Sequence, residues 1–249
     1  MNHFYLTLPS DSSSRYYPEN TTACFKTKLS DRIDLDGEYE VGLAQLIYPR
    51  SWYNFNNRDK SLYIRFEPND GRAEIVQVFS SSQFASEDKL VRILTDMMAL
   101  PKLMFKWDSW VRKIQLIITG NNGNFYMSKS LAALLGFDSE GPYVDIGVYY
   151  ADRVIDLNVN LRMIYVYSDI ASYSLVGDSK VPLLRVVDTQ GDYGKMVSAT
   201  FTHPHYVPLA RNDMETIEIN ISNELGRPVP FEFGKSVVTL HFKRKNKLI

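Results

Sequence analysis

Two histidines separated by one residue, His203 and His205 in the stretch THPHY, are the strongest candidates for metal chemistry in this chain. A protein metal site draws at least three ligands from the chain, and no further ligand follows them at a recognisable spacing. The remaining histidines, His3 and His241, are far away in the sequence. The pattern therefore favours a polar loop, and we predict neither a metal site nor a cofactor.

A second candidate is the group of acids in DLDGEYE, which contains Asp34, Asp36, Glu38 and Glu40. A calcium-binding loop of the EF-hand type places a third acid before the glycine and ends on a glutamate, and this stretch follows neither rule. Asp followed by Gly is a turn signal. The acids therefore indicate a polar turn that leads into a strand.

Signatures of nucleophilic and phosphate chemistry are missing. The sequence has no G-x-S-x-G, P-loop or dinucleotide fingerprint, and Cys24, the only cysteine, lacks the context of a nucleophile. One cysteine also rules out an intrachain disulfide framework. A glycosidase would need two facing carboxylates, which the sequence neither reveals nor excludes. We therefore predict no catalytic residues and no enzyme activity.

Basic residues gather at the C-terminus in HFKRKNKLI, namely Lys243, Arg244, Lys245 and Lys247. They could contact nucleic acid or an acidic neighbour from the inside of an assembly, but four charges give only a weak hold at physiological salt. A solvated chain end is the alternative.

Aromatic residues are abundant, with 16 Tyr, 13 Phe and 3 Trp, and many fall on predicted loops or strand ends. Tyr and Trp are favoured at protein interfaces because they bury a large area at low entropic cost. For any single residue, capping the core of its own domain is the alternative. As a set they predict a surface that another chain covers, with these candidates: Tyr16, Tyr17, Trp52, Tyr53, Tyr173, Tyr193 and Tyr206.

The composition is that of a folded protein. The 249 residues are 45% hydrophobic and 23% charged, with a formal net charge of −1. This balance gives no support for a bulk attraction to nucleic acid or membranes. The N-terminus has no basic segment followed by an apolar core, and no apolar run approaches the ~18 residues of a membrane span. We expect synthesis in the cytoplasm without a signal peptide.

Hydrophobic side chains mostly alternate with polar ones, as in half-buried strands. The clearest case is ETIEINIS, where Ile217, Ile219 and Ile221 share one face. The stretches 39–47 and 161–167 are apolar on both faces, which predicts central strands covered on both sides. Turn signals separate these runs at strand-like spacing, which predicts an all-β sandwich or barrel.

Two segments have helical patterns, near 87–99 and 129–135. Ser86 and Ser128 can cap their N-termini, and Gly136 can end the second helix in the left-handed conformation. We therefore predict one domain over 1–249, with strands from about 1–66 and 151–249 and an insertion at about 67–150.

Several phrases together resemble one family. They are FYLTLPSDSS, YYPENTTACFKTKL, DLDGEYEVGLAQLIYPRSWYN, IYVYSDI with VGDSKVPLLRVV, and the closing YVPLARNDMETIEINISNELGRPVPFEFGKSVVTLHFKRK. In this combination the chain is similar to the minor capsid, or penton, protein of Polinton (Maverick) elements and adintovirus-like viruses. The similarity runs nearly end to end, and the closing phrase is its most specific part.

The resemblance implies a single jelly-roll β-sandwich with an inserted subdomain that contains the two short helices. It also implies a structural virion protein that forms homopentamers at the vertices of an icosahedral capsid. The implied partners are further copies of the chain, a double-jelly-roll major capsid protein, and a fibre or host receptor. Such a protein has no catalytic residues and no cofactor.

The aromatic residues after Pro49 fit this role. A ring of five requires two different patches on each subunit. Trp52 and Tyr53 then lie on a loop that another chain, or the insertion, covers. The main alternative is a carbohydrate- or receptor-binding β-sandwich that uses exposed aromatics as stacking platforms. A jelly-roll hydrolase is a further alternative.

Overall fold

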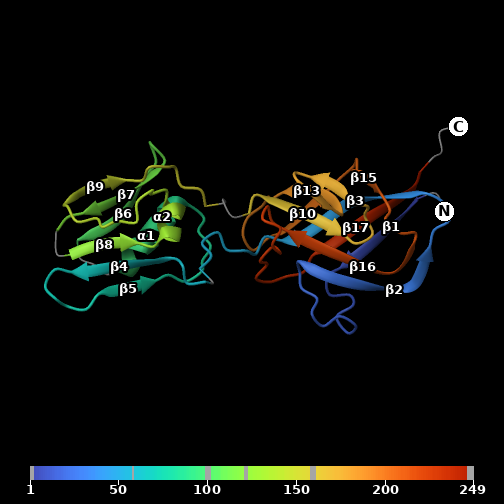
Figure 1. Cartoon of the computed structure of the whole chain (residues 1–249), viewed down its shortest axis with the longest axis horizontal. Helices are drawn as coiled ribbons and strands as arrows, with labels where there is room; N and C mark the ends of the chain where they lie inside the picture. The colour runs from blue at the N-terminus through green and yellow to red at the C-terminus, as the bar shows by residue number, and fades with distance from the viewer. Residues whose placement is uncertain (1–2, 58, 99–101, 121–122, 158–160, 246–249) are drawn as a thin grey trace. The chain divides into compact units, whose positions relative to one another are not determined.

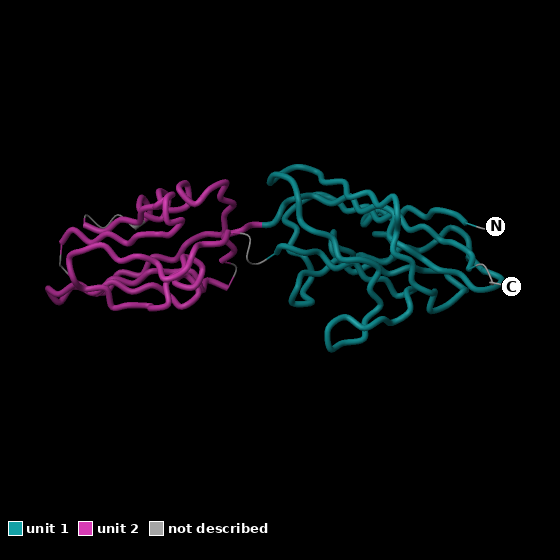
Figure 2. Tube along the Cα trace, turned by 90° about the horizontal axis from the view of Figure 1, so that it is seen from above, with its two compact units in different colours: residues 1–52, 160–249 teal, residues 53–159 magenta. Residues whose placement is uncertain are grey.

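The chain forms two compact units, shown in different colours in Figure 2. The computed structural model describes residues 3–57, 59–98, 102–120, 123–157 and 161–245. The jelly-roll unit comprises Met1–Trp52 and Asn160–Ile249, and the inserted unit comprises Tyr53–Val159. Each unit has a hydrophobic core of its own.

A five-stranded and a four-stranded antiparallel sheet build the jelly-roll unit (Figure 1). The first has the order β1 (His3–Pro9), β17 (Val237–Arg244), β3 (Tyr39–Pro49) and β14 (Met196–Thr200), and β15 (Tyr206–Pro208) also pairs with β3. The second has the order β13 (Leu183–Asp188), β10 (Met163–Ser168), β16 (Asp213–Ser222) and β2 (Cys24–Asp34). A small hairpin of β11 (Ser174–Val176) and β12 (Ser179–Val181) connects β10 to β13.

The strand order confirms the predicted jelly roll. The first and last strands, β1 and β17, are neighbours in one sheet, and β2 pairs with β16, the last strand but one, in the other. This nesting of early strands with late ones is the arrangement of a jelly roll. The side chains of Ile217, Ile219 and Ile221 are fully buried between the two sheets, as the alternation of β16 predicts.

The predicted central strands are β3 and β10, and each has a neighbour on both sides. Their inward side chains form the core, for example Leu43 and Val166. Their outward side chains differ from the prediction, because Ile47 and Tyr165 are only half-buried within this chain. The outward apolar side chains of these two central strands are therefore only partly covered by the rest of the chain.

The inserted unit contains two three-stranded antiparallel sheets and both helices. One sheet has the order β5 (Ile75–Val78), β4 (Tyr63–Pro68) and β8 (Gly123–Met127), and the other has the order β6 (Leu103–Asp108), β7 (Lys113–Ile118) and β9 (Gly147–Tyr150). The helices are α1 (Glu87–Met98) and α2 (Lys129–Leu135). Their apolar residues join those of both sheets in one core.

The helix ends follow the sequence signals. The Ser128 hydroxyl accepts a hydrogen bond from the backbone N–H of Leu131 at 3.3 Å, and Gly136 ends α2 with φ of 89°. The Ser86 hydroxyl accepts a hydrogen bond from the N–H of Lys89 at 3.3 Å at the start of α1. Residue 99, the last of the predicted first helix, lies outside the described residues.

The boundaries of the insertion differ from the prediction. Strand β4, expected among the strands of the jelly roll, pairs with β5 and β8 instead. The two units therefore divide at residues 53 and 159, and not at about 67 and 150. The alternation of Leu62, Ile64 and Phe66 indicates a half-buried strand, but a period of two does not say which sheet the strand joins.

Candidate assembly surface

The outward side of the sheet that contains β1, β17, β3, β14 and β15 carries a continuous group of side chains that we call the uncharged face. Cross-strand pairing places Thr7 opposite Thr239 and Thr239 opposite Gln45 at its centre. None of its members is Asp, Glu, Lys or Arg, and the charged pair Glu40 and Lys243 borders it at one end of the sheet. The members are Tyr5, Thr7, Pro9, Gln45, Ile47, Met196, Ser198, Thr200, Tyr206, Val237, Thr239 and His241.

Polar groups at the centre of the uncharged face already bond to one another. The hydroxyls of Thr7 and Thr239 are 3.3 Å apart. The Gln45 amide nitrogen Nε2 donates to Ser198 Oγ at 3.1 Å and to Thr200 Oγ1 at 3.2 Å. Covering a paired polar group costs less than covering one whose only partner is water. This surface can therefore be buried without stranding a charge or many unpaired donors.

One end of the uncharged face is an aromatic and imidazole cluster. The Tyr206 hydroxyl lies 2.6 Å from His241 Nδ1, and the Tyr5 ring stacks on the His241 ring with centroids 4.3 Å apart. Burial lowers the pKa of His241, and the nearby His3 and Lys243 lower it further. The lowered pKa favours the neutral imidazole, and the charged neighbour of the cluster is Lys243, whose Nζ lies 5.3 Å from the centre of the Tyr206 ring.

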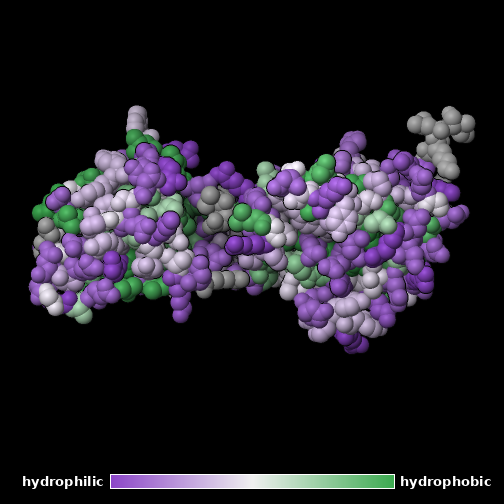
Figure 3. Space-filling model, viewed as in Figure 1, coloured by the Kyte–Doolittle hydropathy of each residue, from purple (hydrophilic) through white to green (hydrophobic). Residues whose placement is uncertain are grey.

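Along β2 and β16 the outward side of the other sheet has the opposite character, and we call this part the charged face. The outward side of the neighbouring β10 is different, because it carries the stacked rings of Tyr165 and Tyr167. Its members on β2 and β16 include Lys26, Lys28, Arg32, Asp213 and Glu218. Lys26 Nζ lies 3.1 Å from Glu218 Oε2, and Arg32 Nε donates to Asp213 Oδ1 at 2.6 Å. Exposed pairs of this kind contribute little to stability and are compatible with solvent. Hydrophilic residues also cover most of the visible surface of each unit (Figure 3).

Trp52 belongs to the core of its own unit, so the prediction that it is an interface residue is wrong. Its side chain is only 3% exposed. Its ring stacks on Tyr48 with centroids 6.1 Å apart and contacts the edge of Phe231 at 5.8 Å. The aromatic surface of Trp52 is therefore already covered by residues of the jelly-roll unit.

The connection after β3 turns back onto its own domain. The Ser51 hydroxyl donates to the Phe233 carbonyl at 2.9 Å, and the Arg50 guanidinium lies 4.2 Å from the centre of the Trp52 ring. Burial lowers the pKa of Arg50. Tyr53 is half-buried and begins the inserted unit. The break in alternation after Pro49 resembles an exposed loop in sequence, although the loop is packed.

Two of the other candidate tyrosines are well exposed. Tyr16, in the connection between β1 and β2, is 64% exposed, and Tyr173, which precedes β11, is 69% exposed. Tyr17 is half-buried in the same connection as Tyr16. Lys28 Nζ lies 4.6 Å from the centre of the Tyr16 ring. An interface role for these tyrosines remains a prediction.

Tyr193 and Tyr206 are half-buried and lie on different elements. The Tyr193 ring, in the connection before β14, contacts the edge of Phe233 with centroids 6.0 Å apart. Tyr206 lies on β15 and belongs to the uncharged face, whereas the other candidate tyrosines are not members of it. The Thr, Ser and Gln residues at the centre of this face escaped the sequence analysis, because no single one of them stands out. The available signal was the run of uncharged residues at alternate positions of β1, β3 and β17, which ends at Glu40 on β3 and Lys243 on β17.

The basic residues at the C-terminus are largely part of the sheet. Lys243 and Arg244 are the last residues of β17, so the interpretation of these two as a tail is wrong. Lys245 follows the strand, and its Nζ lies 3.8 Å from Glu38 Oε2. Lys247 lies outside the described residues. The alternating pattern of β17 continues into the basic stretch. The first two basic residues are therefore part of the sheet.

The histidine pair and the acidic turn show no gathering of ligands. His203 Nδ1 lies 3.2 Å from the Thr202 hydroxyl. In the described part of the chain, no three His, Cys, Asp or Glu side chains come close enough together to hold a metal ion. Among the same residues, no helix combines the length and the apolar character that crossing a membrane requires.

Comparisons with known proteins reveal a likeness in structure. Neither a family model nor a curated protein matches the sequence. The crystal structure of the selenomethionine-labelled mavirus penton protein matches with a TM-score of 0.53 and 12% sequence identity, over 98% of this chain and 99% of that chain. A chain in the cryo-EM structure of the Sputnik virophage matches with a TM-score of 0.45 and 10% identity, over 98% of each chain. At such low identity the mavirus match establishes the fold, and it spans both units.

Proposed function

We propose that this chain is a penton, a minor capsid protein that forms homopentamers at the vertices of an icosahedral virion. The observation that carries the proposal is the near-complete overlap with the mavirus penton protein, which covers the jelly roll together with its insertion. A jelly roll alone serves many functions, so the shared insertion adds weight. The sequence phrases given above further suggest a Polinton (Maverick) element or an adintovirus-like virus as the source.

The uncharged face supports a role in assembly. A closed ring of five requires a heterologous contact, in which one patch of a subunit meets a different patch of the next. The cores of protein interfaces are depleted in charged residues, and the centre of the uncharged face has none. We infer that this face is one of the two patches and that the neighbouring subunit covers it.

The proposed partners follow from a vertex position. Further copies of the chain make the ring, and a double-jelly-roll major capsid protein surrounds it. A fibre or a host receptor would bind on the outside. The role proposed is structural and requires no catalytic group, metal or cofactor.

A second candidate function is a carbohydrate- or receptor-binding module. The exposed rings of Tyr16 and Tyr173 favour it, because an exposed aromatic face can stack on an apolar face of a ligand. A glycan array with the purified protein tests this second function. Loss of glycan binding in a Tyr173→Ala variant would identify the Tyr173 ring as the stacking surface. A vertex protein could also carry such a site.

The direct test is native mass spectrometry of the purified protein across a concentration series. The proposal predicts a pentamer that becomes more populated as concentration rises, because oligomerisation follows mass action. A second series includes the major capsid protein, since the ring could close only at a vertex. A protein that remains monomeric in both series would overturn the proposal, and sugar binding by that monomer would favour the second candidate.

A further inference from the structure

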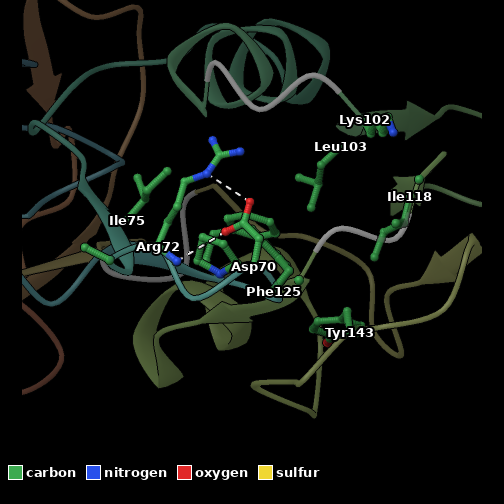
Figure 4. A pocket seen from close by; sticks show the side chains of 13 residues that line it. Asp70, Arg72, Ile75, Lys102, Leu103, Ile118, Phe125 and Tyr143 are labelled. Atoms are coloured by element: carbon green, nitrogen blue, oxygen red, sulfur yellow. Dashed lines mark hydrogen bonds and ion pairs between the residues drawn. The ribbon is translucent and has the colours of Figure 1, made fainter.

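The inserted unit contains a mostly apolar cavity of about 320 Å³ that is partly open to solvent, and Figure 4 shows the side chains that line it. It lies between the two three-stranded sheets, because its walls come from strands of both. Its apolar wall residues are Phe66, Ile75, Leu103, Ile118, Phe125 and Tyr143. A cavity of this size is at the lower end of the range for small-molecule sites.

The side chains that form the walls of the cavity turn mainly apolar groups toward its interior. The Tyr143 hydroxyl donates to the Ser139 carbonyl at 2.7 Å, so the wall presents its ring. Burial raises the pKa of Tyr143 to about 12, which keeps the phenol neutral. Phe125 contacts the Tyr143 ring, with centroids 6.2 Å apart. An apolar cavity offers a water molecule few partners, so an apolar group is the better occupant.

The rim of the cavity is cationic. Asp70 and Arg72 lie on one side of the hollow, across from Leu103 and Ile118, and Arg72 Nε lies 2.9 Å from Asp70 Oδ2 (Figure 4). Lys102 also lines the cavity and is exposed. In the part of the chain that the structure describes, no ion pair involves Lys102. The rim therefore holds two cations against one carboxylate.

The position of Lys102 depends on a glycine. A Cβ atom on Gly120 would lie 2.0 Å from Cδ of Lys102, which is far too close. Gly120 therefore leaves room for the carbon stem of Lys102, and both residues line the cavity.

We propose that this cavity binds a small monoanionic amphiphile, with its apolar chain or ring between the two sheets and its carboxylate at the rim beside Lys102 and Arg72. The apolar walls disfavour a polar body, and the excess cation disfavours a neutral or positive head. This inference goes beyond the proposed capsid function and does not depend on it, because all its residues belong to the inserted unit.

The test is calorimetric titration of the full-length protein with decanoate, with decanol and 2-naphthoate in separate arms. We expect saturable binding of decanoate at one site, and decanol at least about tenfold weaker because it lacks the charge. The naphthoate arm distinguishes a ring from a chain as the preferred body. Equal affinity for decanoate and decanol would overturn the assignment of the rim.

Two pairs of variants locate the site. Lys102→Glu should weaken decanoate about tenfold and leave decanol unchanged, whereas Lys106→Glu, exposed on the strand β6 that follows Lys102 but not lining the cavity, should change neither. Ile75→Trp should fill the mouth and abolish binding of both, whereas Val76→Trp points to the other side of β5 and should not. Circular dichroism verifies that each variant is folded. Decanoate binding that survives both Lys102→Glu and Ile75→Trp would place the ligand elsewhere and overturn the proposal.

Discussion

The uncharged face and the charged face of the jelly roll cover the same core and differ in the charge of their side chains. On the inner side, both sheets supply fully buried aliphatic residues, such as Leu240 from β17 and Ile219 from β16. On the outer side, β17 presents Thr239 and His241, and β16 presents Glu218. The core constrains only every second residue of a strand. The remaining positions are free to match whatever lies outside the sheet.

The absence of charge on the uncharged face is a cost for an isolated subunit. Exposed sheets are normally protected from association by charged side chains on their surfaces and edges. The charged face follows this rule, with pairs such as Lys26 and Glu218. The uncharged face does not, which fits a surface that is covered in an assembly.

Replacement of Trp52 should have the largest effect, and it tests the core that both faces share. Trp52→Ala should lower the free energy of unfolding by about 3–5 kcal/mol, because it opens a large cavity beside Tyr48 and Phe231. Urea unfolding followed by circular dichroism measures it. The control is Tyr173→Ala at an exposed position, expected to change stability by less than about 0.5 kcal/mol. If Trp52→Ala were as mild as the control, Trp52 would not be a core residue.

A charge on the uncharged face should disrupt assembly more than the same charge on the other face. Thr239→Glu puts a carboxylate at the centre of the uncharged face, and burying it unpaired should weaken the oligomer by at least about tenfold. Thr216→Glu is the matched control, because Thr216 lies opposite Lys28 on the charged face. Native mass spectrometry compares the two. Equal loss of pentamer in both variants would remove the distinction between the faces.

Acid should weaken the uncharged face through His241. The pKa of His241 is lowered below its ordinary value of 6.5 by burial, with His3 and Lys243 contributing. The unfolded chain therefore binds the proton at a higher pH than the folded chain. Stability is thus complete above the ordinary pKa and falls as pH drops through it toward the lowered value. A charged imidazolium also costs more to bury, so assembly should weaken in the same direction.

This pH effect can be assigned with His241→Gln, which removes the titrating ring and retains a partner for the Tyr206 hydroxyl. Urea unfolding and oligomer populations at about pH 7.5 and about pH 5.5 should differ less in the variant than in the unaltered protein. An identical pH dependence would place the effect on a group other than His241.

Salt should have the smallest effect. A contact made by the uncharged face lacks ion pairs, so the pentamer population should change little between about 0.05 and about 0.5 M salt. A contact made by the charged face would lose affinity over the same range as its charges are screened. Sedimentation velocity at both concentrations distinguishes them, and a steep decline with salt would assign the contact to the charged face.

Local features of the fold were predictable from the sequence, whereas membership of a unit was not. The caps at Ser86, Ser128 and Gly136 act within a few residues, and each is found as predicted. The alternation of β16 likewise predicted its buried isoleucines. By contrast, β4 was assigned to the wrong unit, because its pattern would fit a sheet in either one.

The candidate site was predictable only in part. Tyr206 was among the predicted interface residues and lies on the uncharged face, whereas Trp52 was predicted as a covered loop residue and is core. Residue type alone favoured aromatics as interface residues. It could not identify Thr7, Gln45 and Thr239, which matter as a group and not one by one.

The sequence by itself determined the all-β character, both helices, and which side of each long strand faces inward. These properties depend on neighbours a few residues apart, where side-chain periodicity and caps act. Only the tertiary structure decided that β1, β17, β3 and β14 lie side by side. Residues such as Thr7 and Thr239 become neighbours through pairing across 232 positions of the chain, and no local pattern encodes that meeting. The uncharged face exists because of this pairing, and the cavity between the two sheets of the inserted unit arises in the same way.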